Sequence, residues 1–295
     1  MNYRVIHETR YTYSETVTLC HNEAHLIPRT FDRQRCSQYG MHIEPRPVDY
    51  QEREDFFGNR IAYFSIEQPH RTLTVTATSE VETQEASIEA MAVHKGIAWE
   101  KVRDQLMADN EAEVLDARQY TLDSPLIKVS PELLAFAHGA FSPGRSLVEA
   151  VLDLIGRIHR EFTYAPGFST VTTPLSQVLE QRRGVCQDFA QLAIGCLRAL
   201  GLAARYVSGY LETIPPLGQE RLAGADASHA WFAVYVPIHG WLDFDPTNNQ
   251  ATEGQHITAA WGRDYSDVSP LKGVVFGGGT QHTLSVSVDV ARIGT

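Results

Sequence analysis

One cysteine, one histidine and one aspartate occupy positions in this chain from which they could together transfer an acyl group. Cys186 follows Gly184-Val185 and opens a predicted helix, where unpaired backbone N–H groups and the helix dipole favour a negatively charged thiolate. The same N–H groups could stabilise an oxyanion. His229 begins a predicted strand and Asp245 ends the next one. A thiolate, an imidazole base and a carboxylate that orients the base are the components of nucleophilic catalysis through a thioester.

The two strands that would carry the base and the carboxylate are joined by the tight turn Pro237-Ile238-His239-Gly240. If the strands pair, alternation along each of them places His229 on one face and both Asp243 and Asp245 on one face. Either aspartate could then approach the histidine. Spacing alone leaves both open: Asp245 stands at the end of its strand, and Asp243 is the local alternative.

Other chemical motifs are absent from the sequence or have the wrong spacing. His21 and His25 stand four residues apart, but in neither of the orders that zinc peptidases use, so no metal site is predicted. The chain has no Gly-x-Ser-x-Gly, Walker or dinucleotide-binding motif, and no EF-hand loop. We therefore expect neither a cofactor nor a metal.

The composition is that of a globular protein that does not bind nucleic acid. The 295 residues are 43% hydrophobic and 21% charged, and their formal net charge of −11 repels phosphate backbones. The four scattered cysteines include no Cys-x-x-Cys pair, which excludes a disulfide framework and a thioredoxin-type site. No segment has the pattern of a signal peptide or a transmembrane helix, so we expect a cytoplasmic protein without a membrane partner.

The elements that must position the three residues divide the chain into three parts. Residues 1–84 alternate polar and apolar residues between joints that contain Pro and Gly, which predicts an all-β sandwich domain. Residues 85–125 have weak helical character and are interpreted as a mixed linker. In residues 126–295 predicted helices come first and strands afterwards, which indicates an α+β catalytic core whose last strand is His282–Val290.

Three helices of the third part have clear start signals. Ser130-Pro131 supplies an N-cap and a proline for the first turn, and Ser146 opens a capping box before a long apolar face. The helix that begins at Cys186 continues to about residue 200. Cys196 lies on the apolar stripe of that helix, so we expect it to be a packing residue.

The segments around the three candidate residues resemble the transglutaminase-like superfamily. They read GVCQDFAQLAIGCLRALGLAARYVSGYL and SHAWFAVYVPIHGWLDFDPTNN, with a cysteine opening a helix, a His-Ala-Trp strand and a Gly-Trp…Asp-Pro-Thr strand. The opening strands and the tail GRDYSDVSPLKGVVFGGG are similar to bacterial members, so the resemblance covers nearly the whole chain. It implies a papain-like core in which a helix packs against an antiparallel sheet. It also implies Cys186 as the nucleophile, His229 as the base and Asp245 as the orienting carboxylate.

The resemblance further implies a side chain that completes the oxyanion hole. Tyr164, in EFTYAPG, and Gln187, beside the nucleophile, are the two candidates. Trp231 and Trp241 are candidates for the walls of the cleft, where they would exclude water, and the alternative for both is a place in the core.

These observations predict a cysteine-dependent acyl-transfer enzyme that acts on peptide or glutamine-type amides of a protein or peptide substrate. The resemblance to bacterial members favours hydrolysis, as in a protease or amidase. Transfer to an amine, as in a transglutaminase, uses the same thioester and stays open as the alternative. A non-catalytic peptide-binding or scaffold protein is a further alternative, against which the complete set of three residues argues. An arylamine-type acetyltransferase is disfavoured by the His-Ala-Trp and Asp-Pro-Thr contexts. The substrate and the oligomeric state are not specified by the sequence.

Overall fold

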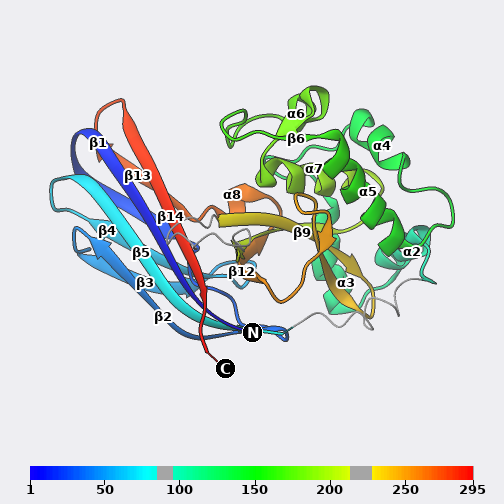
Figure 1. The fold of residues 1–295 in the computed structure, drawn as a ribbon, viewed down its shortest axis with the longest axis horizontal. Coiled ribbons are helices and arrows are strands. Elements are labelled where there is room, and N and C mark those ends of the chain that lie inside the picture. The colour runs from blue at the N-terminus through cyan, green and yellow to red at the C-terminus, as the bar shows by residue number, and fades with distance from the viewer. Residues whose placement is uncertain (85–95, 213–227, 295) are drawn as a thin grey trace, which may run out of the picture.

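The computed structural model describes residues 1–84, 96–212 and 228–294. Figure 1 shows a sheet of long strands at one end of the molecule, helices at the other end, and a second sheet between them. The expected α+β class with an all-β N-terminal part is therefore confirmed. In the described ranges, no helix is both long and apolar enough to cross a membrane.

The first sheet is antiparallel and is built around one long strand, β1. Its strand order is β2-β5-β1-β4-β3, and β13 and β14 also pair with β1. The strands are β1 (Asn2–Ala24), β2 (Gln34–Glu44), β3 (Asp49–Glu54), β4 (Arg60–Ile66), β5 (His70–Thr83), β13 (Leu271–Gly277) and β14 (His282–Arg292). The pairing of β1 with β5 shifts register between Thr12 and Val17. The first half of β1 lies between β5 and β14, and its second half lies between β4 and β13.

The two halves of this sheet pack on each other. Their shared apolar cluster contains Leu73 and Val75 of β5 together with Phe64 and Ile66 of β4. The second half of β1 contributes Val17, Cys20 and Ala24 to this cluster, whereas Tyr3 and Val5 at its start pack with Tyr210 and Ile257 of the second sheet. The expected sandwich is thus one hydrogen-bonded sheet that folds over at β1, instead of two separate sheets.

The last two strands of the chain lie in this first sheet. We expected the strand at 282–290 to belong to the catalytic core, 126–295. Instead, β14 pairs with β1 from Tyr3↔Arg292 to Tyr13↔His282, and β13 pairs with the second half of β1. An alternating pattern identifies a strand but carries no information about its partner, which explains the difference.

The helical part begins earlier than the pattern indicated. The residues expected as a mixed linker, 85–125, include two helices and a short 3-10 turn, while residues 85–95 lie outside the described part. The helices are α2 (Trp99–Ala108), α3 (Ala112–Arg118), η2 (Gln119–Thr121), α4 (Pro131–His138), α5 (Leu147–Glu161), α6 (Leu175–Gln181), α7 (Cys186–Ala199) and α8 (Tyr265–Val268).

The predicted helix starts are correct, although one is held differently. Ser130 caps α4 by accepting a hydrogen bond from the Leu133 N–H, as expected. Ser146 precedes α5 but its side chain makes no capping bond. Instead, Ser146 forms a β-bridge with Ala98, so tertiary pairing fixes this helix start.

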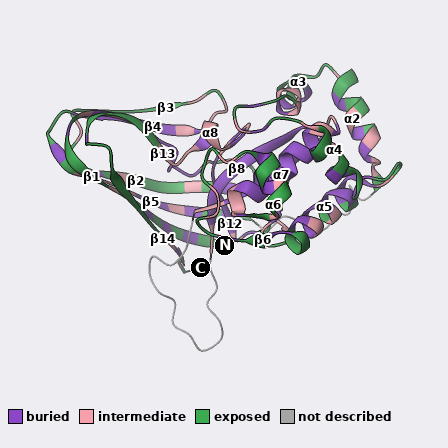
Figure 2. Ribbon diagram, turned by 90° about the horizontal axis from the view of Figure 1, so that it is seen from above, coloured by how far each residue is buried: buried purple, intermediate pink, exposed green. Residues whose placement is uncertain are grey.

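The second sheet carries the candidate base and carboxylate. Its strand order is β11-β10-β9-β8-β12. The strands are β8 (Ala204–Leu211), β9 (Ser228–Val236), β10 (Gly240–Asp245), β11 (Gln250–Ala251) and β12 (His256–Gly262). One face, with Tyr206, Phe232 and Val234, joins the apolar cluster around α7. Figure 2 shows that buried residues gather around α7 and β8, whereas β3 is exposed throughout.

The edge of the second sheet at β12 meets the N-terminal part. The buried Gln34 amide bonds to both the N–H and the C=O of Thr258, each at 2.7 Å. Asn59 does the same with Trp261, at 2.9 Å to its N–H and 2.8 Å to its C=O. Two side-chain amides thus pair with the backbone of β12 and complete hydrogen bonds that a neighbouring strand would otherwise make.

Candidate active site

The candidate nucleophile lies at the N-terminus of α7. The short strand β7 (Arg183–Gly184) leads into it and pairs with β6 (Thr163–Tyr164). The Asp188 carboxylate accepts hydrogen bonds from the Val185 N–H, at 2.8 Å, and from the Ser169 hydroxyl. Burial raises the pKa of Asp188, and these two bonds oppose that shift. A Cβ on Gly184 would lie 2.8 Å from the Cβ of Asp188, so glycine leaves the room that this carboxylate needs. Cys186 is half-buried at the tip of the helix.

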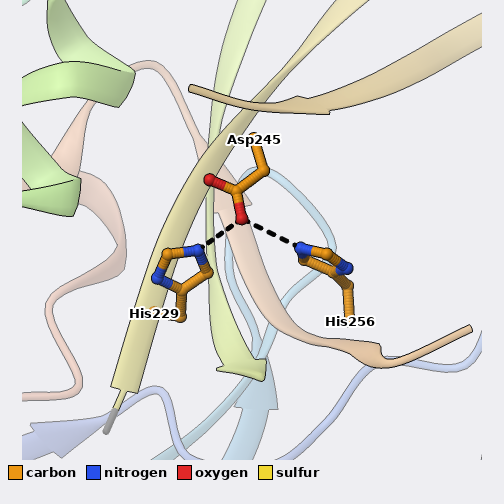
Figure 3. A group of neighbouring side chains, drawn as sticks. All are labelled: His229, Asp245 and His256. Atoms are coloured by element: carbon orange, nitrogen blue, oxygen red, sulfur yellow. Dashed lines mark hydrogen bonds and ion pairs between the residues drawn. The ribbon is translucent and has the colours of Figure 1, made fainter. Parts of the chain in front are cut away.

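The candidate base and the candidate carboxylate are joined by a hydrogen bond. His229 Nε2 lies 2.7 Å from Asp245 Oδ2 (Figure 3). The Asp245 side chain is fully buried, and that of His229 is 10% exposed. In the pairing of β9 with β10, Asp243 lies opposite Ala233, which brings Asp245 diagonally across from His229.

The charges of this pair support each other. Burial lowers the pKa of His229, but hydrogen bonds to Asp245 and to Cys186 outweigh it and raise the pKa to about 10. Burial raises the pKa of Asp245, but hydrogen bonds from His229 and His256 hold it well below its usual range. The ionised Asp245 therefore favours the charged, imidazolium form of His229.

The histidine ring links the cysteine to the aspartate. Because Asp245 engages Nε2, the nitrogen left for the Cys186 side chain is Nδ1. An imidazole held in this way can take the thiol proton and remain charged, since the carboxylate on its other side stabilises the cation. The structure thus joins His229 to Asp245, and Cys186 lies near enough to the ring to affect the pKa of His229.

A second histidine contacts the same carboxylate, and no sequence pattern pointed to it. His256 is buried at the start of β12, and its Nε2 lies 3.1 Å from Asp245 Oδ2 (Figure 3). Its ring is edge-on to Trp231, with the centroids 5.1 Å apart. The alternation in HITAAWG could have identified the strand, but the position of His256 depends on the pairing of β12 with β8.

The turn after β10 holds the carboxylate still. Asp245 Oδ1 accepts from the N–H groups of Thr247, at 2.9 Å, and Asn248, at 3.1 Å. The side-chain amide of Asn248 donates to Oδ2 at 2.7 Å. With the two histidines this makes five hydrogen bonds to one carboxylate, which leaves it no rotational freedom.

The two histidines and the aspartate also have the chemistry of a metal site. Ligand atoms of His229, Asp245 and His256 all lie within 4.8 Å of one another. The backbone N–H donors on Asp245 are fixed by the turn, however, and a metal ion would have to displace the hydrogens that the histidines share with the carboxylate. The hydrogen-bonded arrangement accounts for every atom of the carboxylate, and the prediction that no metal is used is tested by chelation below.

Asp243, the alternative partner for His229, binds Trp231 and Arg33 instead. Its Oδ1 accepts a hydrogen bond from Trp231 Nε1 at 3.2 Å, and its Oδ2 pairs with Arg33 at 3.0 Å. The Trp231 ring lies beside His229, with the centroids 6.1 Å apart. Arg33 precedes β2, so a residue of the N-terminal part helps to hold the tryptophan that packs on the candidate base.

The remaining candidates lie at different distances from this centre. Tyr164 on β6 is opposite Gly184, its ring packs on Phe189 with the centroids 6.4 Å apart, and half of it is exposed. Burial and the charge of Cys186 raise the pKa of Tyr164, which places the phenol within electrostatic reach of the thiol. Gln187 is half-buried beside Cys186.

Trp241 lies at the opposite end of β10 from Asp245. Its ring packs against Tyr120 and Tyr235, with the centroids 5.1 Å and 5.3 Å apart. It borders a separate cavity, described below, and so Trp231 is the tryptophan that the structure brings to His229.

Comparison with known proteins follows the same division of the chain. Residues 3–82 match the family model of the bacterial transglutaminase-like N-terminal region, and residues 135–246 match that of the transglutaminase-like superfamily. A protein of Mycobacterium bovis is 41% identical over 293 residues, which are 98% of this chain and 92% of that protein. A protein of Mycobacterium leprae is 34% identical over 98% of both chains.

Two further similar proteins have names that state an activity. A protein-glutamine gamma-glutamyltransferase of Pseudomonas aeruginosa is 24% identical over 77% of this chain and 35% of that enzyme. A candidate cysteine protease from Cytophaga hutchinsonii has the same fold, with a TM-score of 0.77 over 100% of this chain and 91% of that one, at 19% identity. The expected fold is thereby confirmed in a solved structure. From the two family models and the mycobacterial relatives, the chain belongs to the transglutaminase-like superfamily and carries its bacterial N-terminal region.

Proposed function

We propose that this protein is a cysteine-dependent acyl-transfer enzyme in which Cys186 is the nucleophile, His229 the general base and acid, and Asp245 the orienting carboxylate. The observation that carries the proposal is the buried hydrogen bond of 2.7 Å between His229 and Asp245. The ring of His229 also interacts with the side chain of Cys186 at the tip of α7. Membership of the transglutaminase-like superfamily supports it.

The first half of the reaction forms a thioester. The Cys186 thiolate attacks the carbonyl carbon of a peptide or glutamine-type amide, and a carbon–sulfur bond forms. The tetrahedral intermediate then breaks its carbon–nitrogen bond, and the nitrogen leaves as an amine or ammonia with the proton supplied by the His229 imidazolium. Asp245 stabilises the imidazolium throughout.

The oxyanion of each tetrahedral intermediate needs donors that point at it. The backbone N–H groups at the start of α7 have no intrahelical partner, so the Cys186 N–H is the first candidate. The Tyr164 hydroxyl is the second, because β6 holds this residue next to Gly184 and the ring lies near the thiol. Gln187 is the third candidate, through its amide.

The second half of the reaction consumes the thioester. His229, now neutral, accepts a proton from the acceptor as the acceptor attacks the thioester carbon, and the Cys186 thiolate leaves. Water as the acceptor gives hydrolysis, as in a protease or amidase, and a lysine amine gives a transglutaminase cross-link. We favour hydrolysis, which agrees with the name of the Cytophaga hutchinsonii protein, while the name of the Pseudomonas aeruginosa protein supports the alternative.

Mass spectrometry of peptide libraries incubated with the enzyme, with and without an added primary amine, tests this proposal. Chain cleavage or deamidation of a peptide indicates hydrolysis. Loss of ammonia together with addition of the amine indicates transfer. Cys186→Ala is the control and is expected to show neither product. Activity that survives in Cys186→Ala but is lost after treatment with a chelator would instead identify the His229–Asp245–His256 group as a metal centre.

A non-catalytic scaffold is the competing proposal from another class. It requires that native Cys186 react with a thiol-specific probe no faster than a cysteine in a short peptide. A cytoplasmic location, a protein or peptide substrate and the absence of nucleic acid and membrane partners are further parts of the proposal. They are testable by fractionation of the native host and by co-purification.

A further inference from the structure

A cavity separate from the candidate active site lies between the two sheets. It has a volume of about 680 Å³ and is bordered by strands β8, β10 and β12, by α3 and η2, and by two loops of the N-terminal part. This volume is within the range of small-molecule sites in proteins. No function proposed above uses it.

Arg205 lies in this cavity, and the part of the chain that the structure describes gives its guanidinium no hydrogen-bond or ion-pair partner. The residue is 7% exposed, and Nε is buried without a hydrogen bond. Neither a hydrogen bond nor an ion pair of this guanidinium occurs within residues 1–84, 96–212 and 228–294. Instead, its Cζ lies 3.7 Å from the ring centroid of Trp261 and 4.3 Å from that of Trp241.

This lack of a partner is unusual for a buried charge. Arg198, buried to the same degree, donates to the carbonyls of Tyr120, Ala204 and Arg263 and to the Ser124 hydroxyl. Burial lowers the pKa of Arg205 to about 10, which reflects the cost of removing its charge from water. A guanidinium has five N–H donors in a planar fork that matches a carboxylate, so the missing partner is an anion.

Asp243, the carboxylate whose charge acts most on Arg205 among the described residues, already has other partners. It forms its bonds with Arg33 and Trp231. Because Arg33 and Asp243 neutralise each other, the guanidinium of Arg205 is the uncompensated charge inside the cavity. Three exposed acids, Asp32, Glu113 and Asp116, also border the cavity, and they oppose the entry of a dianion more strongly than that of a monoanion.

The side chains that line the cavity indicate the chemistry of the part of the ligand that does not contact Arg205. Seven of the eighteen lining residues are aromatic: Tyr120 and Tyr235 are buried there, and Trp241 and Trp261 flank the guanidinium. Phe56 is 81% exposed at the border, an unusual position for a large apolar ring. Aromatic walls favour a flat apolar body by stacking and edge contacts.

We propose that this cavity is a binding site for an organic monocarboxylate with a flat, apolar body, and that Arg205 binds its carboxylate between the rings of Trp241 and Trp261. The site is distinct from the candidate active site, since Arg205 pairs with Ala233, four residues along β9 from His229, or roughly 13 Å. Binding here therefore does not require Cys186.

The test compares three probes of the same shape: phenylacetate, its neutral analogue phenylacetamide and its cationic analogue phenethylamine. Isothermal titration calorimetry and thermal melting of the full chain are expected to show binding of phenylacetate and a higher Tm, and at least tenfold weaker binding of the other two. The Cys186→Ala protein is expected to bind phenylacetate with unchanged affinity, so the result does not depend on the proposed catalysis.

Variants of the arginine locate the site. Arg205→Met is expected to abolish binding and to leave the Tm without ligand unchanged or raised, because it removes an unpaired buried charge. Arg10→Met, which removes an exposed arginine on β1, is the matched control and is expected to bind normally. If Arg205→Met does not fold, Arg205→Lys keeps the charge without the planar fork and is expected to weaken binding at least tenfold.

Several results would overturn the proposal. They are equal binding of phenylacetate and phenylacetamide, tighter binding of phenethylamine, undiminished binding by the Arg205 variants, or no detectable binding of phenylacetate at millimolar concentration. Competition by inorganic phosphate as strong as that by phenylacetate would overturn the role assigned to the aromatic walls.

Discussion

Asp243 and Asp245 leave the same face of β10, but their carboxylates bind different partners. Asp245 Oδ2 lies 2.7 Å from His229 Nε2, whereas Asp243 accepts from Trp231 and pairs with Arg33. Both are held by more than one hydrogen bond, so neither can replace the other without rearrangement. One aspartate therefore orients the candidate base, and the other holds the tryptophan beside it.

The first prediction compares these two aspartates. Asp245→Asn is expected to lower kcat by a factor on the order of 10²–10⁴ with little change in KM, because the amide cannot stabilise the imidazolium. Asp243→Asn is expected to lower kcat by less than roughly tenfold, since it affects His229 only through Trp231. Steady-state kinetics of both variants, after circular dichroism has shown that they fold, check this. The opposite order of effects would assign the orienting role to Asp243.

The second prediction concerns the two cysteines of α7. Cys186→Ala is expected to abolish activity, because no other thiol replaces the nucleophile. Cys196 is fully buried in the core, and burial raises the pKa of its thiol to about 12, so it is inert. Cys196→Ala is expected to keep activity and to cost about 1–3 kcal/mol in the free energy of unfolding. Normal turnover by purified Cys186→Ala would refute the mechanism.

The third prediction concerns pH. The pKa of His229, about 10 in the folded chain against 6.5 in a free side chain, keeps the ring charged beside Cys186 at neutral pH. Iodoacetamide is therefore expected to alkylate native Cys186 even at pH 6, and His229→Ala is expected to slow that reaction at least tenfold. Peptide mapping of the labelled site measures this. An unchanged rate in the variant would mean that His229 does not assist the thiol.

The same pair makes stability depend on pH in a definite direction. A group with a raised pKa contributes its full stability below the unfolded value, near pH 6.5, and loses it as the pH rises through about 10. The difference in unfolding free energy between the natural chain and His229→Ala is therefore expected to shrink from pH 6 to pH 10. Urea titrations at the two pH values measure it, and a difference that grows would contradict the ion pair.

The fourth prediction concerns His256. His256→Ala removes one donor from Asp245 and is expected to lower kcat about tenfold, the effect of one hydrogen bond of ~1.4 kcal/mol. His256→Gln places an amide N–H near the same position and is expected to restore most of the rate. The pH profile of Cys186 alkylation distinguishes positioning from a structural role, since loss of a donor changes the charge that Asp245 presents to His229 and so moves the pKa of the ring. Equal loss in both variants, without that movement, would make the role structural.

The fifth prediction concerns the contact between the two sheets. Gln34→Ala leaves the buried N–H and C=O of Thr258 without partners and is expected to cost roughly 2–4 kcal/mol in the free energy of unfolding. Gln51→Ala, on the exposed strand β3, is the control and is expected to change it by less than about 0.5 kcal/mol. Urea unfolding followed by tryptophan fluorescence and by far-ultraviolet circular dichroism is expected to give one shared transition. Two separate transitions would show that the parts fold independently.

The residues that the sequence predicted best are those whose chemistry follows from local position. Cys186 could be placed at a helix start because glycine precedes it and an apolar stripe follows it. His229 and Asp245 could be placed on neighbouring strands because a short turn joins those strands. In each case the signal lies within a few residues of the side chain concerned.

The features that the sequence did not predict depend on distant pairing. His256 reaches Asp245 because β12 pairs with β8 through a register shift between Thr258 and Ala260, which no local pattern encodes. Arg205 is an ordinary strand residue until the N-terminal loops close over it. The domain boundary at 126–295 placed the last strand in the catalytic core for the same reason, because alternation identifies a strand without identifying its neighbour.

The pairing of β1 with β14 has a consequence for how the chain is made. On a ribosome, β1 emerges early, but the strand that covers one of its edges, β14, emerges after the whole second sheet and all of α7. During synthesis that edge is an open row of N–H and C=O groups, which is a template for pairing with other chains. Closure of the sheet must therefore be a late and slow event, since it joins opposite ends of the sequence. Nascent chains that stop before residue 282 are expected to aggregate or to occupy chaperones, however well the catalytic core has folded by then.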